Sequence, residues 1–227
     1  MIEKFAKLIP KSLEKMSGAV FYSGKNAFKG KKDLYIIGLN PGGDFELQEN
    51  ETISWHANEI IVNRKSNFSE YRDGIWKKGK KAGESPMQKR VLHLFLKLGL
   101  SPSDVPASNV CFVRSRGESE IKEKLNFYSE LCWPVHESII KELDIKIILC
   151  FGQRSGKFVR NKIGAHEELL NFRFEEKNGR PWKTLTFKNP KGQIVITATH
   201  PSRADWTNPV TDISPLVKKI YNKYKRK

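Results

Sequence analysis

Four short, largely apolar runs, separated by long amphipathic stretches, constrain the fold of this chain more than any other feature. They occupy residues 34–37, 110–113, 145–151 and 194–198. Runs of this length suit strands that are buried on both faces, and the stretches between them are long enough for crossover helices. We therefore expect an α/β protein: a three-layer α/β/α sandwich around a central, mostly parallel, four-stranded sheet.

The stretches between these runs carry helical periodicity. Helices are predicted over residues 87–98, over 121–143, from about residue 154, and within 209–227. Gly99 ends the first of them, and Pro134 is expected to kink the second or to divide it in two. Residues 169–189 differ, because Asn178-Gly179 is typical of a hairpin turn and predicts an antiparallel excursion.

One segment, residues 60–86, has little apolar periodicity and many charges. Its basic and aromatic side chains are interleaved: Arg64, Lys65, Phe68, Tyr71, Arg72, Trp76, Lys77, Lys78, Lys80 and Lys81. This composition predicts a basic insertion or a mobile loop. Because the chain contains neither an internal repeat nor a linker, we expect one domain that spans residues 1–227.

The 227 residues include 41 basic and 25 acidic side chains, which gives a formal net charge of +16. Such an excess favours polyanionic partners, nucleic acid first and an anionic membrane surface second. No apolar stretch reaches the about 18 residues of a membrane span, and the N-terminus lacks a signal-peptide core. We therefore expect a cytoplasmic protein, associated with the nucleoid in a prokaryote or nuclear in a eukaryote.

The three cysteines, Cys111, Cys132 and Cys150, are widely spaced and form no CxxC pair. Each lies in an apolar stretch, so we expect reduced thiols in the core. The five histidines show neither HExxH nor HxH spacing. No metal site is therefore predicted.

Polar side chains follow the first and the last apolar run, each in a turn that contains proline. Asn40 lies in Gly38-Leu39-Asn40-Pro41-Gly42, and His200 lies in His200-Pro201-Ser202. In an open parallel sheet, ligands bind outside the carboxyl ends of the strands. Either segment alone is typical of a simple proline turn, and the first does not match the dinucleotide pattern GxGxxG. Together they predict an active site that is divided between two strand ends.

The two motifs, in this order and with strands between them, resemble the uracil-DNA glycosylase superfamily. The first has the GxNPG form of the mismatch-specific and single-strand-selective branches, and HPS occurs in the single-strand-selective and uracil-specific branches. Residues 109–114 are similar to the strand whose asparagine reads the uracil edge. Residues 147–152 are similar, more weakly, to a strand and glycine between the motifs. The resemblance spans residues 34–206.

The resemblance implies a role for each polar side chain. Asn40 would position the attacking water, and His200 would donate a hydrogen bond to the pyrimidine O2 as negative charge develops there. Asn109 would read the Watson–Crick edge of a flipped uracil, because its amide accepts from N3–H and donates to O4. Cytosine presents the opposite pattern and would be rejected.

Further residues are implied to contact the base, and the turn of the first motif contributes Gly38, Leu39, Pro41 and Gly42. Either Trp55 or Phe45 is expected to stack on the base. The uracil-specific branch has a tyrosine where Gly42 stands, so the glycine leaves room for 5-substituted uracils or deaminated purines. That branch also has an aspartate in place of Asn40, which implies that this enzyme is slower.

The segment after His200 is implied to contact DNA. Ser202 and Arg203 would lie against the backbone, with Arg203 as a wedge, and Trp206 would either fill the gap left by the flipped nucleotide or pack beneath the loop. Arg114 and Arg116 are expected on the same rim. The basic segment 60–86 offers charge and aromatic rings for single-stranded DNA.

We therefore predict a monofunctional DNA glycosylase that hydrolyses the N-glycosidic bond of uracil, or of a related deaminated or oxidised base, with water as nucleophile. It is expected to act as a monomer and without a cofactor. Branches with an iron–sulfur cluster need four cysteines and this chain has three, so no cluster is expected. Two alternatives stay open: a catalytically silent nucleic-acid-binding protein that retains the glycosylase fold, and an enzyme of base or nucleotide metabolism.

Overall fold

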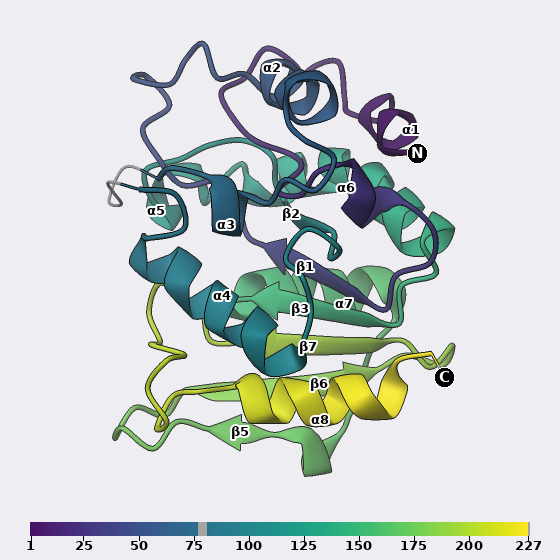
Figure 1. The fold of residues 1–227 in the computed structure, drawn as a ribbon, viewed down its shortest axis with the longest axis vertical. Helices are drawn as coiled ribbons and strands as arrows, with labels where there is room; N and C mark the ends of the chain where they lie inside the picture. Colours follow the sequence, from purple (N-terminus) through teal and green to yellow (C-terminus); the bar gives the residue numbers. More distant parts are fainter. Residues whose placement is uncertain (77–80, 227) are drawn as a thin grey trace.

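A computed structural model describes residues 1–76 and 81–226 of the chain. Within these residues, seven strands form one mixed sheet in the order β2, β1, β3, β7, β6, β4, with β5 paired to β6 (Figure 1). The strands are β1 (Leu34–Gly38), β2 (Ala107–Asn109), β3 (Ile147–Phe151), β4 (Glu167–Glu168), β5 (Phe174–Glu175), β6 (Lys183–Lys188) and β7 (Ile194–Ala198).

Strands β2, β1, β3 and β7 run parallel and form the centre of the sheet. The prediction of a mostly parallel central sheet is therefore confirmed, but the predicted number of four strands is wrong, because the described residues form a sheet of seven. Strand β6 pairs antiparallel with β7, and both β4 and β5 pair antiparallel with β6, so the sheet extends beyond that core. The turn between β5 and β6 contains Gly179 at φ 76°, in agreement with the predicted hairpin.

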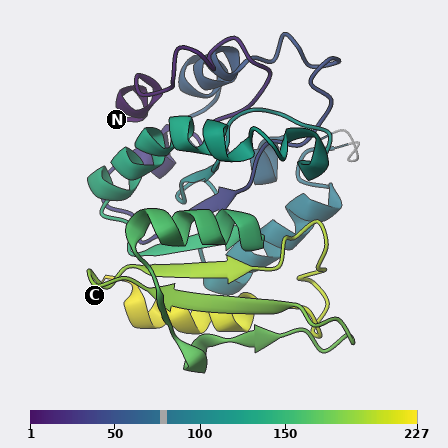
Figure 2. The same cartoon turned by 180° about the vertical axis from the view of Figure 1, so that it is seen from behind.

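Helices cover both faces of the sheet and give the molecule three layers (Figures 1 and 2). On one face lie α4 (Pro86–Leu98) and α8 (Ser214–Tyr224), and on the other lie α6 (Leu125–Glu142) and α7 (Gln153–Ile163). Successive strand residues point to opposite faces. Ile36 therefore packs in the apolar core beneath α4 and α8, whereas Ile37 packs in the core beneath α6 and α7.

The remaining helical elements are short: α1 (Ile2–Ala6), η1 (Lys25–Phe28), α2 (Ile53–Asn58), η2 (Glu59–Asn63), α3 (Glu70–Asp73), α5 (Glu118–Ile121) and η3 (Leu170–Phe172). Helix α4 begins at a capping box of Ser85 and Gln88 and ends at Gly99, as the sequence predicts. Helix α6 continues through Pro134. The helical stretch predicted over residues 121–143 is instead interrupted between the end of α5 at Ile121 and the start of α6 at Leu125.

The second predicted strand is displaced. Strand β2 occupies Ala107–Asn109, and the apolar run at 110–113 leaves the sheet although its side chains are buried. There the backbone pairs with other segments: Cys111 N–H donates to the Leu39 carbonyl at 2.9 Å, and Ala19 N–H donates to the Phe112 carbonyl at 3.0 Å. The apolar pattern predicted correctly that residues 110–113 are buried, but it predicted wrongly that they form a strand of the sheet.

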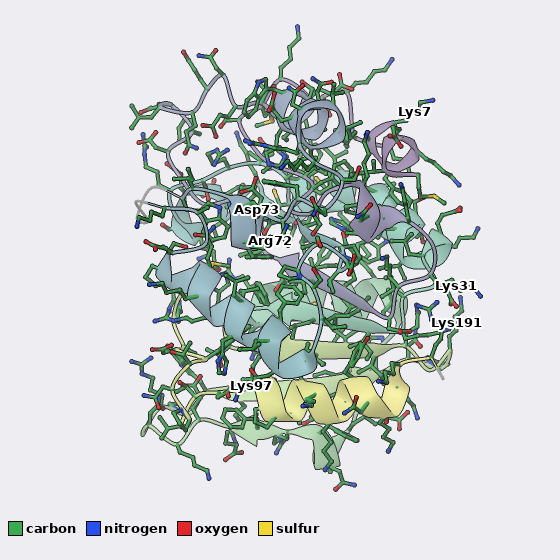
Figure 3. The ribbon with its side chains drawn as sticks, in the orientation of Figure 1. Lys7, Lys31, Arg72, Asp73, Lys97 and Lys191 are labelled. Carbon is green, nitrogen blue, oxygen red and sulfur yellow. The ribbon has the colours of Figure 1, made fainter. Side chains whose placement is uncertain are left out.

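The segment 60–86 is only partly the loop that was expected. Phe68 and Tyr71 are buried at 6% and 3% exposure, so this part of the segment belongs to the core. Arg72 pairs with the neighbouring Asp73 at 2.8 Å (Figure 3). Lys77, Lys78 and Lys80 lie outside the described residues, so the predicted role of this segment in binding DNA stays a prediction. Among the helices that the structure describes, none has the length and apolarity to cross a membrane.

Candidate active site

The polar residues of the two sequence motifs lie at the carboxyl edge of the parallel strands. The register pairs that define this edge are Gly38 with Asn109, Ile37 with Cys150 and Phe151 with Ala198. These pairs place the last residues of β2, β1, β3 and β7 at one level across the sheet. Asn40 comes two residues after the end of β1, and His200 comes two residues after the end of β7. The two motifs, far apart in sequence, therefore lie at the same edge of the sheet, on the left in Figure 1.

The side-chain amide of Asn40 is held in one orientation. Its Nδ2 donates to Ser115 Oγ at 2.8 Å and to the backbone carbonyls of Pro41 at 3.1 Å and Val113 at 3.4 Å. Carbonyl oxygens only accept hydrogen bonds, so the nitrogen of the amide must face them. Oδ1 therefore points away from these partners and is left as an acceptor at the end of β1.

Asn109 is the last residue of β2 and is only 7% exposed. Its Nδ2 is buried and has no hydrogen-bond partner among the described residues. A buried donor without a partner costs about 1–3 kcal/mol, so an acceptor on a ligand that reached Nδ2 would recover this free energy. The adjacent Gly38 makes room for this side chain, because a Cβ at Gly38 would lie 2.2 Å from Asn109 Oδ1.

Tyr22 lies beside Asn109, a neighbour that sequence reasoning missed. Its backbone N–H donates to the Ala107 carbonyl of β2 at 2.9 Å, which brings residue 22 alongside the strand. Burial first, and the charge of Glu70 second, raise the pKa of Tyr22 to about 12, while the Asn109 amide acts in the opposite direction. The phenol is therefore uncharged at neutral pH and lies next to the Asn109 amide.

The imidazole of His200 has a defined tautomer. Its Nδ1 lies 3.0 Å from the backbone N–H of Ser202, which can only donate, and 2.7 Å from Ser202 Oγ. Nδ1 is therefore an acceptor, and the proton of the neutral ring is on Nε2. Burial first, and the charge of Arg203 second, lower the pKa of His200 to about 4. At neutral pH the ring is an uncharged N–H donor.

Strand β3 lies between the strands that carry Asn40 and His200, and it ends in residues that support the histidine. The Phe151 ring meets the His200 ring edge to face, with centroids 6.1 Å apart. Gly152 follows at φ 97°, and a Cβ there would lie 3.9 Å from His200 Cβ. Only glycine adopts this backbone conformation readily, so the close turn into α7 depends on it.

Aromatic rings connect the two ends of the site. Tyr71 of α3 lies 6.1 Å from the ring of Tyr22 and 6.4 Å from that of Phe151, and Tyr22 lies 6.2 Å from the ring of His56. Burial first, then the charges of Arg114 and Arg64, lower the pKa of His56 to about 3. The periodicity of the sequence carried no signal for this aromatic wall, because its members come from separate short segments.

Arg114 is not on an open rim, which corrects the expectation for this residue. Its side chain is 8% exposed. The guanidinium donates to Ser17 Oγ at 3.1 Å, to the Gly42 carbonyl at 3.0 Å and to Glu51 at 2.9 Å. Because the Arg114 guanidinium is buried and its N–H groups already donate to these acceptors, it holds the turn after Asn40 in place and is not available to a phosphate.

The position of Trp206 excludes one of the two roles that were expected for it. It is fully buried, with its ring 5.3 Å from that of Phe151 in an edge-to-face contact. It therefore packs beneath the loop and does not fill a gap in DNA. Ser202 and Arg203, in contrast, are exposed at the surface of the same loop.

Trp55 and Phe45, the two rings expected to stack on the base, are both exposed. Trp55 lies on α2 and is 45% exposed, while Phe45 is 38% exposed and carries the Arg116 guanidinium 5.0 Å above its ring. Arg116 itself bonds to three carboxylates: Asp44, Glu46 and Glu120. Its charge is therefore largely compensated.

The turn of the first motif has an open side. A Cβ on Gly42 would meet no atom within 4 Å, so the space that a larger side chain would fill is free. Pro41 is buried and Leu39 packs partly against the core beneath α6 and α7, so both residues anchor the turn. A separate cavity lies at the opposite edge of the sheet between Lys31, Asp33, Leu100 and Tyr221, away from these polar groups.

In the part of the chain that the structure describes, no three His, Cys, Asp or Glu side chains are grouped to hold a metal ion. No protein-family model matches the sequence, and no curated protein matches it either. The chemical interpretation of the site therefore rests on its own residues and on the motifs they form.

Proposed function

We propose that this chain is a monofunctional DNA glycosylase that hydrolyses the N-glycosidic bond of uracil or of a related deaminated or oxidised base. The observation that carries the proposal is the orphaned amide donor of Asn109, buried at the same sheet edge as Asn40 and His200. The three side chains offer complementary functions: a buried donor, an oriented acceptor and a neutral N–H donor.

The Asn109 amide suits the edge of a pyrimidine that carries a carbonyl. Its Nδ2 would donate to O4 of a flipped uracil, and its Oδ1 would accept from N3–H. This pairing would satisfy the donor that the protein leaves without a partner. Cytosine would present its own donor to Nδ2, so the same pocket would reject it.

Asn40 and His200 suit the two charges that develop when the glycosidic bond breaks. Asn40 Oδ1, fixed through the three contacts of Nδ2, would hold a water near the sugar carbon as the bond lengthens. Nε2–H of His200 would stabilise negative charge on O2 of the leaving base. A neutral imidazole suits this role because it donates one oriented hydrogen bond without delivering its proton.

The open side of Gly42 supports a substrate class beyond uracil itself. With no atom within 4 Å of a Cβ built there, this turn leaves space for a substituent on C5 of the pyrimidine or for a larger deaminated base. DNA as the partner is supported by the net charge of +16.

End-labelled oligonucleotides test the proposal. Each carries one uracil, hydroxymethyluracil, hypoxanthine, xanthine or mismatched thymine, in single and double strands, and is treated with alkali after incubation. We expect alkali-labile sites at one or more of these bases with the native protein and with the matched control Asn171→Ala, an exposed asparagine of η3. Asn40→Ala should abolish them while DNA binding persists. Salt-sensitive DNA binding without labile sites at any base would instead favour the silent nucleic-acid-binding protein.

A further inference from the structure

The hairpin between β5 and β6 extends the candidate active site beyond the predicted DNA-binding loop. Strand β6 runs antiparallel to β7, with Leu185 opposite Thr197. The tip of the hairpin, residues 176–182, therefore projects past the carboxyl end of β7, where His200 follows. Figure 1 shows this tip beside the loop that leads into α8, at the left of the sheet.

Two contacts fix the tip against the loop that carries His200. The Arg180 guanidinium donates to the carbonyl of Arg203 at 3.2 Å, and the backbone N–H of Lys177 donates to the Val210 carbonyl at 2.9 Å. Next to the tip, Gln153 Nε2 at the start of α7 donates to the carbonyl of Lys183, the first residue of β6, at 3.1 Å.

The tip presents positive charge that no carboxylate compensates. Lys177, Arg180 and Arg203 are exposed, and none of them pairs with an acid within the described part of the chain. Of the nearby acids, Glu175 pairs with Lys183 at 2.7 Å. Glu176 is 7% exposed and accepts from the Asn178 amide at 2.9 Å, so it is turned inward.

The Arg180 side chain is also ordered in advance of binding. Its guanidinium lies 4.7 Å from the centroid of the Trp182 ring, over the face of the indole. This cation–π contact and the hydrogen bond to the Arg203 carbonyl hold the guanidinium and reduce the side-chain entropy that is lost when it contacts an anion. A planar fork with five N–H donors fits the oxygens of a phosphate.

We propose that the β5–β6 tip is a second DNA contact, in which Lys177 and Arg180 bind backbone phosphates of the duplex beside the flipped nucleotide. The inference rests on the proposed function for its partner. It assigns to the hairpin an interaction that is independent of base sequence, because Lys177 and Arg180 are cations, and the amide of Asn178 is engaged by Glu176 and by the backbone N–H of Arg180. The loop after His200 and the hairpin would then hold neighbouring phosphates through Arg203 and Arg180.

Binding to an undamaged, fluorescein-labelled duplex tests this contact without any excision chemistry. The dissociation constant is measured by anisotropy at several KCl concentrations for the native protein and for Lys177→Gln/Arg180→Gln. A control, Lys97→Gln/Lys191→Gln, removes the same charge from exposed positions that form no ion pair within the described residues. Lys191 lies in the turn before β7, at the opposite edge of the sheet (Figure 3).

We expect the tip variant to bind at least tenfold more weakly near 0.1 M salt, with a log–log salt dependence less steep by about 1.8, since each lost phosphate contact contributes about 0.9. The control should change this slope far less. The variant Arg180→Lys, which keeps the positive charge, should retain most of the native slope. Equal slopes in the two double variants, or a slope unchanged by the tip variant, would overturn the proposal.

The same samples separate the two proposals. A native protein that binds the duplex through the tip but releases no base from any modified oligonucleotide would contradict the proposed glycosylase alone. A native protein that releases uracil, with a tip variant of unchanged salt dependence, would contradict the hairpin contact alone.

Discussion

At the end of β1, Gly38 provides the space that the Asn109 side chain occupies. The register pairs the two residues, and a Cβ on Gly38 would overlap Asn109 Oδ1. The orphaned amide is therefore positioned by the absence of a side chain on the neighbouring strand. In the sequence, Gly38 is part of a turn motif, and nothing in the motif reveals that its partner across the sheet is Asn109.

Gly38→Ala should displace the Asn109 amide. We expect a loss of about 1–3 kcal/mol in the free energy of unfolding, because the added methyl group must push a packed side chain aside. The rate of uracil excision should fall on the order of 10²-fold, since recognition depends on the position of that amide. Gly117→Ala is the matched control, because Gly117 has an extended backbone and open space around a Cβ. Equal activity of the two variants would contradict this assignment.

The neutral imidazole of His200 determines how the excision rate depends on pH. With a pKa lowered to about 4, the ring stays neutral from pH 8 down to about pH 5. The excision rate at saturating DNA should therefore show no inflection near pH 6.5, the value for an unperturbed histidine, and should fall only as pH approaches 4. His200→Ala should be slower by about 10²–10³ across the plateau. An inflection near pH 6.5 that disappears in His200→Ala would show that the cationic ring is involved.

Among the elements, helix α4 holds the loop that carries His200. Arg90 donates to the Pro201 carbonyl at 2.6 Å and pairs with Asp205 at 3.2 Å. One turn further along the helix, His93 Nε2 lies 3.1 Å from Asp212. Trp206 is buried beneath the loop between these two attachments. The loop is thus fixed at its start, middle and end.

Arg90→Gln should loosen the first of these attachments. We expect a fall in the single-turnover rate on the order of 10-fold to 10²-fold, because His200 loses its support, with little change in the affinity for undamaged duplex. Lys89→Gln removes the same charge from an exposed neighbour on the helix and should leave the rate unchanged. A loss of affinity at constant rate in Arg90→Gln would show instead that Arg90 contacts DNA.

The elements also show how far the sequence could predict this structure. Runs of apolar residues identified β1, β3 and β7, because a strand buried on both faces needs such a run. The run at 110–113 was equally apolar, yet its backbone bonds to Leu39 and Ala19 outside a regular strand. Apolarity measures burial, and the pairing of the backbone depends on distant segments that a single sequence does not reveal.

Within the site, the motif residues were predictable but their environment was not. Asn40, Asn109 and His200 follow or end predicted strands, so their common edge follows from a parallel sheet. The burial of Arg114 could not be predicted, because it depends on acceptors at Ser17 and Gly42, the first in a distant segment. Tyr22 was missed for the same reason, since it reaches the site through a segment with no motif.

Across the described part of the molecule, burial is the main cause of a lowered pKa at three histidines. The value falls to about 3 for His56 and to about 4 for His136 and His200. Each ring is neutral in the folded state at a pH at which it is protonated in the unfolded state. The unfolded state therefore binds more protons between about pH 6.5 and pH 4, so stability is present above pH 6.5 and is lost as the pH falls through this range.

Urea unfolding at different pH values measures this effect. Glu70, whose pKa is raised by burial, acts in the opposite direction. At about 1.4 kcal/mol per proton and pH unit, the free energy of unfolding should fall by on the order of 2–4 kcal/mol between pH 6 and pH 5. The variant His136→Gln should show a shallower dependence. A free energy that stays constant over this range would mean that the imidazoles are not buried as described.

We propose that Asn40, Asn109 and His200 form one site that releases a base from DNA. Chromatographic detection of free base from a uracil-containing oligonucleotide in a single turnover tests this assignment. We expect free uracil and a strand that stays intact until alkali is added. Asn40→Ala, Asn109→Asp and His200→Ala should each be slower by about 10² or more. Free uracil released at the native rate by all three variants, or no base released by the native protein, would contradict it.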